Sequence, residues 1–296
     1  MTTQIRDTGS GAAGNRATDG GEVELLMRGA IDVDLDRARS LLTSSAAKLG
    51  DLIRGIEKPD ARPPKLEWTS AEVAVHLVQT FRYDLSNVEG TSTPYPVVDG
   101  KVLASGAKQS EQRIAEEPER DPQKLADLFD KAVADFLEGT AGRDPLQPVT
   151  FAEGHAMTLA NLVATVLGEV LVHGYDIAQA QSKPWKMDPE AARVAVYATT
   201  ATLPLGINPE TTADIDVRLN VRIRGGQCFA VHIANGKGWS EECGRADATI
   251  SADAATFMLV GFGRMGPLGP ALKGKILAWG RKPYLAARLS KYTLPI

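Results

Sequence analysis

The spacing of apolar residues predicts helices in the first half of the chain. From Asp32 to Ile56, apolar positions recur every three or four residues, which is the repeat of one helix face. Prolines between positions 59 and 64 end this helix, because proline removes a hydrogen-bond donor and restricts the residue before it. A second helix is expected to begin at Thr69, since Thr69-Ser70-Ala71-Glu72 has the form of a capping box.

Two further helices are expected after a long loop. The segment from Gly90 to Gly106 is rich in proline and other turn formers and predicts a loop that could cover a site. Asp121-Pro122 predicts the start of a third helix, and Thr158 to Gln181 has the pattern of a fourth. Four helices in this half of the chain indicate a bundle.

The pattern changes after Pro184 to that of an α+β unit. Asp188 to Leu203 predicts one more helix, and Asp216 to Ile223 alternates apolar and polar residues as a half-buried strand does. Gly225-Gly226 indicates a hairpin turn, with the returning strand at Cys228 to Ile233. We then expect a strand at 248–252, a helix at 254–260 and a Gly/Pro-rich loop at 261–270. Another strand is expected at 276–279, followed by a last helix.

These changes in pattern predict two folded domains. A chain of 296 residues is long for one core and comfortable for two. We expect a disordered tail at residues 1–24, a helical domain at 25–185 and a smaller α+β domain at 186–296.

Composition and charge indicate which kinds of binding partner the protein can have. The chain is 43% hydrophobic and 24% charged, as a globular protein is, and no apolar run reaches the roughly 18 residues of a membrane span. Its net charge of -4 gives no general attraction to nucleic acid or anionic lipid. Cys228 and Cys243 are too few for a disulfide framework, and the first residues lack the apolar segment of a secretory signal. We expect a cytoplasmic protein with no nucleic-acid or membrane partner.

Candidate chemistry lies on the fourth predicted helix. Glu169 and His173 fall on its inner, apolar face, where two titratable groups cost several kcal/mol unless each has a partner. Residues four apart have Cβ atoms about 5–6 Å apart, so one divalent cation can bind both. His76 lies on the second helix with Val73 and Leu77 and supplies a third ligand. Two histidines and a glutamate with an open fourth position are typical of catalytic zinc.

Other interpretations of these polar residues stay open. A single Glu-x-x-x-His spacing also arises by chance or from an internal hydrogen bond. Asp176 can orient the imidazole of His173 or cap the helix end. His155 suits a capping or solvated role, and His232 a structural or exposed one. The glycine-rich segment 261–269 lacks the Lys-Ser/Thr ending of a phosphate loop and is interpreted as a turn.

At these residues the chain resembles the DinB-like family of mycothiol-dependent maleylpyruvate isomerases and thiol S-transferases. Trp68 to His76 is similar to the family's tryptophan, helix cap and first metal histidine, and Glu169 to Asp176 is similar to its second metal segment. The resemblance spans about Ala30 to Gln181. It implies a DinB-like four-helix bundle that holds one zinc-type ion through His76, Glu169 and His173.

The second half is similar to the sterol-carrier-type domain that often follows this bundle. The likeness rests on the strand pair around Gly225-Gly226, the strand from Asp247 to Ile250 and the segment Trp279-Gly280-Arg281. It implies the fold class α + (α+β), with a smaller sterol-carrier-like α+β domain after the bundle. It also places Arg281 in a cleft, where we expect it to act as a catalytic cation.

The family implies an actinobacterial zinc enzyme with mycothiol or a similar thiol as cosubstrate. The thiol would add to a small electrophilic substrate, and then either leave after bond rotation, giving isomerisation, or stay, giving S-transfer. One alternative is a non-catalytic lipid- or small-molecule-binding protein with a structural metal. Another is a zinc enzyme of a biosynthetic pathway that uses no thiol. The motif selects neither a substrate nor an oligomeric state.

Overall fold

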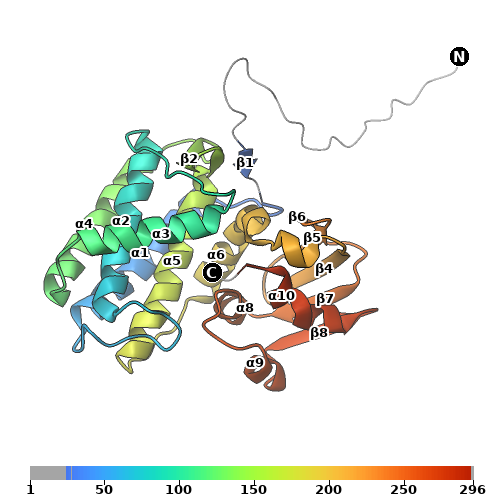
Figure 1. Cartoon of the computed structure of the whole chain (residues 1–296). Helices are drawn as coiled ribbons and strands as arrows, with labels where there is room; N and C mark the ends of the chain where they lie inside the picture. The colour runs from blue at the N-terminus through green and yellow to red at the C-terminus, as the bar shows by residue number, and fades with distance from the viewer. Residues whose placement is uncertain (1–24, 28, 295–296) are drawn as a thin grey trace, which may run out of the picture.

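Long helices fill the first part of the chain in the computed structural model, which describes residues 25–27 and 29–294 (Figure 1). The tail expected at 1–24 lies outside these residues. The elements of this part are β1 (Leu25–Met27), α1 (Leu35–Arg54), α2 (Ser70–Glu89), α3 (Val102–Glu116), α4 (Pro122–Gly139), β2 (Pro148–Ala152), β3 (His155–Thr158) and α5 (Leu159–Ala180).

Side-chain caps fix where the long helices begin. At α2, the Thr69 hydroxyl accepts a hydrogen bond from the Glu72 amide, and the Glu72 carboxylate accepts one from the Thr69 amide. Asp34, Asp121 and Thr158 accept bonds from first-turn amides of α1, α4 and α5 in the same way. The helix starts predicted at Thr69, Asp121 and Thr158 are therefore confirmed, and they belong to α2, α4 and α5.

Helices α1, α2, α4 and α5 pack against one another around a shared apolar core. The ring of Phe81 on α2 meets the rings of Phe129 and Phe136 on α4 edge-on, with centroids 5.6 and 5.5 Å away. Helix α5 contacts α1, α2 and α6, and most of its residues are buried. Polar side chains on the inner face of α5 are thus enclosed by protein.

The segment between α2 and α4 differs from the expected loop. Helix α3 begins at Val102, so the loop predicted to reach Gly106 ends earlier. This helix was hard to predict, because Lys101 provides no side-chain cap and only Val102, Ser105 and Ile114 are buried along it. The three-stranded sheet of order β1-β3-β2 was also not predicted, since its strands are too short for a clear alternation.

The second part is an α+β unit. A five-stranded sheet of order β6-β5-β4-β7-β8 has one parallel pair, β4 with β7, among antiparallel neighbours. The elements of this second part are α6 (Pro189–Thr202), η1 (Leu203–Gly206), α7 (Pro209–Thr212), β4 (Asp216–Ile223), β5 (Cys228–Ala234), β6 (Lys237–Glu242), β7 (Ala248–Ala252), α8 (Ala254–Gly261), α9 (Leu268–Leu272), β8 (Ile276–Gly280), η2 (Pro283–Arg288) and α10 (Leu289–Tyr292). The predicted strands at 216–223, 228–233, 248–252 and 276–279 are confirmed, and β6 was missed.

Helix α6 connects the two parts through apolar contacts. It packs against α5 on one side and against α8 on the other (Figure 1). One cluster of buried apolar side chains continues from the long helices to Val221 and Phe229 of the sheet and Met258 of α8. The second part is therefore packed onto the helices.

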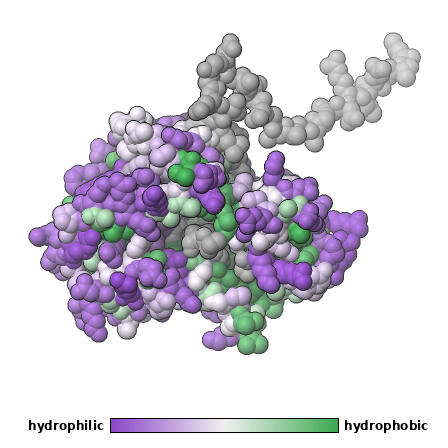
Figure 2. Space-filling model, viewed as in Figure 1, coloured by the Kyte–Doolittle hydropathy of each residue, from purple (hydrophilic) through white to green (hydrophobic). Residues whose placement is uncertain are grey.

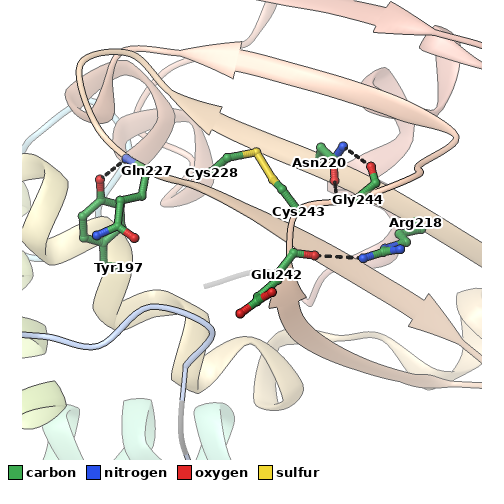
Figure 3. Close-up of a disulfide and its surroundings, with 8 residues drawn as sticks. All are labelled: Tyr197, Arg218, Asn220, Gln227, Cys228, Glu242, Cys243 and Gly244. Atoms are coloured by element: carbon green, nitrogen blue, oxygen red, sulfur yellow. Dashed lines mark hydrogen bonds between the residues drawn. A yellow bond between two sulfur atoms is a disulfide. The ribbon is translucent and has the colours of Figure 1, made fainter. Parts of the chain in front are cut away.

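Cys228 and Cys243 form a disulfide, which is contrary to our expectation from the low cysteine count. In the register of β5 with β6, Phe229 faces Glu242, so Cys228 and Cys243 form the next opposed pair, with Cα atoms 5.8 Å apart. Asn220 exchanges hydrogen bonds with the backbone of Gly244 beside it (Figure 3). The pair was missed because β6 was not predicted, and without β6 no register brings the two cysteines together.

The surface is mixed, with polar residues covering most of the visible face (Figure 2). An apolar patch lies over α9 at the lower edge, and the exposed apolar residues of this region are Leu268, Leu272, Leu277, Trp279 and Tyr284. Among the helices of the described residues, none combines the length and the hydropathy that a bilayer crossing requires.

Gly174 packs against the indole of Trp185, in the connection to the second part. A Cβ at position 174 would overlap this ring, which is fixed by its Nε1–H donating to the Leu171 carbonyl at 3.0 Å. We predict that Gly174→Ala lowers the free energy of unfolding by about 1–3 kcal/mol, because the ring must shift. Urea denaturation measures this. The control is Gly206→Ala, where an added Cβ meets nothing within 4 Å; equal losses in the two variants would contradict this contact.

Candidate metal centre

Helices α2 and α5 bring His76, Glu169 and His173 together. His76 lies in the second turn of α2, and Glu169 and His173 lie one turn apart on α5. The Nε2 atom of His76 is 3.3 Å from Glu169 Oε2, and the Nε2 atom of His173 is 3.2 Å from the same oxygen. One donor atom from each residue lies within 4.8 Å of the other two. The three residues selected from the sequence are therefore neighbours in space.

The surroundings of this trio fit a single divalent cation. Two imidazole nitrogens and a carboxylate oxygen form a donor set that zinc accepts. The two histidines are buried, whereas the Glu169 side chain is 27% exposed, so the trio is open on one side. The Trp68 ring covers His76 with centroids 4.9 Å apart, and it limits the movement of that imidazole.

The charge states of two of these groups suit metal binding. Burial lowers the pKa of His76 despite its contact with Glu169, so its imidazole is neutral at pH 7. Burial alone would raise the pKa of Glu169, but hydrogen bonds to His173 and His76 hold that pKa well below its ordinary value. A neutral imidazole and an ionised carboxylate are the forms that bind a metal.

Asp176 contacts His173 directly. Its Oδ2 atom lies 3.0 Å from His173 Nδ1, which donates to it and leaves Nε2 facing Glu169. Burial would lower the pKa of His173, but the bonds to Asp176 and Glu169 outweigh this effect and raise the pKa to about 9. Helix α5 continues to Ala180. Of the two roles considered for Asp176, the structure therefore shows the contact with the imidazole.

Arg264 holds the other side of Asp176 and was missed in the sequence. Its Nε atom lies 3.0 Å from Asp176 Oδ1, and its Nη2 atom lies 3.0 Å from Oδ2. Arg264 belongs to the glycine-rich segment after α8, which we had interpreted only as a turn. The sequence separation of 88 residues explains the omission, since no local pattern connects this arginine to α5.

Asp84 on α2 was also missed, although its spacing could have identified it. Thr80 and Asp84 follow His76 at intervals of four residues, and Thr80 Oγ1 lies 3.5 Å from His76 Nε2. Burial, together with the charge of Glu169, raises the pKa of Asp84 to about 7. Asp84 can therefore gain or lose a proton near neutral pH.

Comparison with known proteins identifies the helical segment. Residues 42–178 match the family model described as the mycothiol maleylpyruvate isomerase N-terminal domain. This segment belongs to that domain family. The family suggested by the motifs at Trp68 to His76 and Glu169 to Asp176 is thereby confirmed for this part of the chain.

Solved structures extend the similarity in fold beyond the isomerase N-terminal domain. A crystal structure of the mycothiol-dependent maleylpyruvate isomerase has a TM-score of 0.52 and 14% identity, covering 81% of this chain and 93% of that one. A structure of a single-site mutant of a mycothiol-dependent maleylpyruvate isomerase has a TM-score of 0.54 and 14% identity, covering 85% and 95%. At this identity the likeness concerns the fold. No curated protein matches the chain significantly.

The remaining candidate residues make local contacts. Arg281 is 63% exposed and pairs with Asp247 at 3.2 Å, and no contact among the described residues joins it to the trio. Its catalytic role stays a prediction. His232 pairs with Asp216 at 2.8 Å, and His155 Nδ1 lies 2.7 Å from the Glu153 carbonyl.

We predict that the metal affinity of the His76–Glu169–His173 trio rises with pH. His173, with a pKa of about 9, must lose its proton before Nε2 can bind a cation. The apparent affinity for zinc should therefore increase by about tenfold per pH unit from about pH 7 until it levels off near pH 9. Chelator competition across this range measures it, with proton release by calorimetry as a second readout. An affinity that is constant over the range would contradict the protonated state of His173.

Proposed function

We propose that this protein is a zinc-dependent enzyme that uses mycothiol or a similar low-molecular-weight thiol. Its reaction is isomerisation of, or thiol transfer to, a small electrophilic substrate. The observation that carries the proposal is the approach of two imidazole nitrogens to one oxygen of Glu169 at a position open on one side. The family match of residues 42–178 supports the same chemistry.

The domain organisation that we propose follows the sequence. Residues 25–185 form a DinB-like four-helix bundle around α1, α2, α4 and α5, and residues 186–296 form a sterol-carrier-like α+β domain. The mutual packing of those helices and the change to a sheet after α6 support this division. A cytoplasmic location, with neither nucleic acid nor membrane as a partner, belongs to the same proposal.

Each side chain of the centre has a role in this proposal. His76, Glu169 and His173 hold the ion, which when bound supplies a Lewis acid that makes a thiol more acidic. Trp68 excludes water from one side of His76. Asp84 holds or releases a proton at its carboxyl group, because the pKa of about 7 allows either state. Arg281 remains a candidate for binding an anionic substrate group.

Two observations favour this function over the alternatives. A structural zinc site normally closes with four protein ligands, whereas here three donors come together and Glu169 stays partly exposed. The match to a thiol-dependent family argues for a thiol over water as the second reactant. A non-catalytic lipid-binding protein would need neither feature.

We predict that Glu169→Ala and His76→Ala lose bound zinc and thiol-dependent activity together. Two remaining ligands hold zinc weakly, whereas the helical content should change little because apolar packing with α1 and α4 holds α2 and α5 in place. Elemental analysis, circular dichroism and a screen of electrophiles with and without mycothiol are the measurements. Glu153→Ala is a control, because Glu153 is not part of the trio. Its contact with His155 is made by the backbone carbonyl, which the substitution keeps.

Each outcome of this experiment separates the candidate functions. Full zinc content in both variants would contradict the ligand assignment. Zinc loss accompanied by unfolding would favour a structural metal. Activity that is equal with and without thiol would favour the zinc enzyme that uses no thiol.

We predict that Cys228→Ser/Cys243→Ser keeps most of the thiol-dependent activity, because the nucleophile is an external thiol. The variant should lose about 2–4 kcal/mol of unfolding free energy, the usual contribution of a disulfide that closes a loop of this length. Denaturation and activity assays of the variant and of wild type treated with reductant should agree. A folded double variant without thiol-dependent activity would contradict the claim that the reaction is independent of the protein's own cysteines.

A further inference from the structure

The proposed metal centre contacts the second part of the chain through one arginine. Arg264 comes from the segment after α8, and its guanidinium spans both oxygens of Asp176. Its Nη1 atom donates to the Phe262 carbonyl at 2.9 Å. The side chains of Arg264 and Asp176 are only 8% and 3% exposed. A buried pair of this kind is costly to form from solvated ions, so its position requires an explanation.

The backbone before Arg264 is built to fix its position. Gly263 has φ of 68°, and the Gly263 amide donates to the Val260 carbonyl while the Arg264 amide donates to the Leu259 carbonyl. This is a Schellman motif, in which a left-handed residue ends the helix. Glycine adopts that conformation without strain. Arg264 therefore leaves the end of α8 in a fixed direction.

Asp176 transmits this position to the trio. The same oxygen, Oδ2, accepts from Arg264 Nη2 and from His173 Nδ1, both at 3.0 Å. A carboxylate held by two arginine nitrogens cannot rotate freely, so the direction of the bond to His173 is fixed. A histidine whose Nδ1 is held in this way presents Nε2 in a constant direction.

We propose that Arg264 is a positioning residue for the metal centre: through Asp176 it orients His173 and links packing of the second part of the chain to metal binding. The proposal rests on the proposed function, because it requires that His173 binds a metal ion. Linkage is reciprocal, so a metal bound at His173 must in turn stabilise the segment that carries Arg264.

Zinc affinity of four folded proteins tests this role. Arg264→Met should bind zinc about 10–100-fold more weakly than wild type, the usual effect of removing such a supporting contact. Arg264→Lys should fall between them, since it keeps the charge without the two-pronged geometry. Arg218→Met is the matched control, because it breaks the Arg218–Glu241 pair at 2.8 Å, which makes no contact with the trio among the described residues. It should keep wild-type affinity.

Two readouts distinguish positioning from general stabilisation. In an Asp176→Asn background, Arg264→Met should have no further effect on zinc affinity, because Arg264 acts through that carboxylate. In wild type, zinc should slow hydrogen exchange of the Arg264 and Met265 amides, which donate to Leu259. This second readout needs no variant, so it remains decisive even where Arg264→Met does not fold.

The outcomes separate the two proposals. If wild type binds no zinc, the proposed function fails and the role of Arg264 with it. If wild type binds zinc but Arg264→Met matches Arg218→Met in affinity, the positioning role alone is wrong. Unchanged exchange of the Arg264 and Met265 amides on adding zinc would also contradict it.

Discussion

The centre depends on one constraint, which is the cost of enclosing charged groups between packed helices. Glu169, His173, Asp176 and Arg264 lie at the junction of α5 with the second part of the chain, and three of them have side chains no more than 8% exposed. Each charged group of this series has an oppositely charged neighbour within hydrogen-bond distance, and these attractions offset the cost of removing each group from water. Removing one member would leave its neighbour unpaired, which ties the fold and the chemistry to the same contacts.

The arrangement also explains why the second part of the chain is packed on the helices. Helix α6 supplies the apolar contact, and Arg264 supplies a specific polar one. Apolar burial is not directional and leaves the orientation of two units loosely defined, whereas a two-pronged arginine–carboxylate pair has one geometry. The combination fixes the position of the second part relative to His173.

Sequence alone was sufficient for features that depend on local periodicity. The helices around His76 and His173, their caps at Thr69 and Thr158, and the strand alternation at 216–223 all follow from neighbouring residues. Grouping Glu169 with His173 required only the repeat of a helix, and adding His76 required the assumption that amphipathic faces meet. Features that depend on distant pairing were lost. Arg264 and the Cys228–Cys243 disulfide need the tertiary fold and the register of an unpredicted strand.

X-ray absorption at the zinc edge tests the central claim most directly, because it reports the atoms bound to the ion. Protein loaded with zinc should show only nitrogen and oxygen neighbours at about 2.0–2.2 Å, two of them imidazole. Adding mycothiol should introduce one sulfur at about 2.3 Å, and Glu169→Ala should bind no ion to measure. A spectrum without imidazole scattering, or one that mycothiol leaves unchanged, would contradict a zinc centre that binds the thiol.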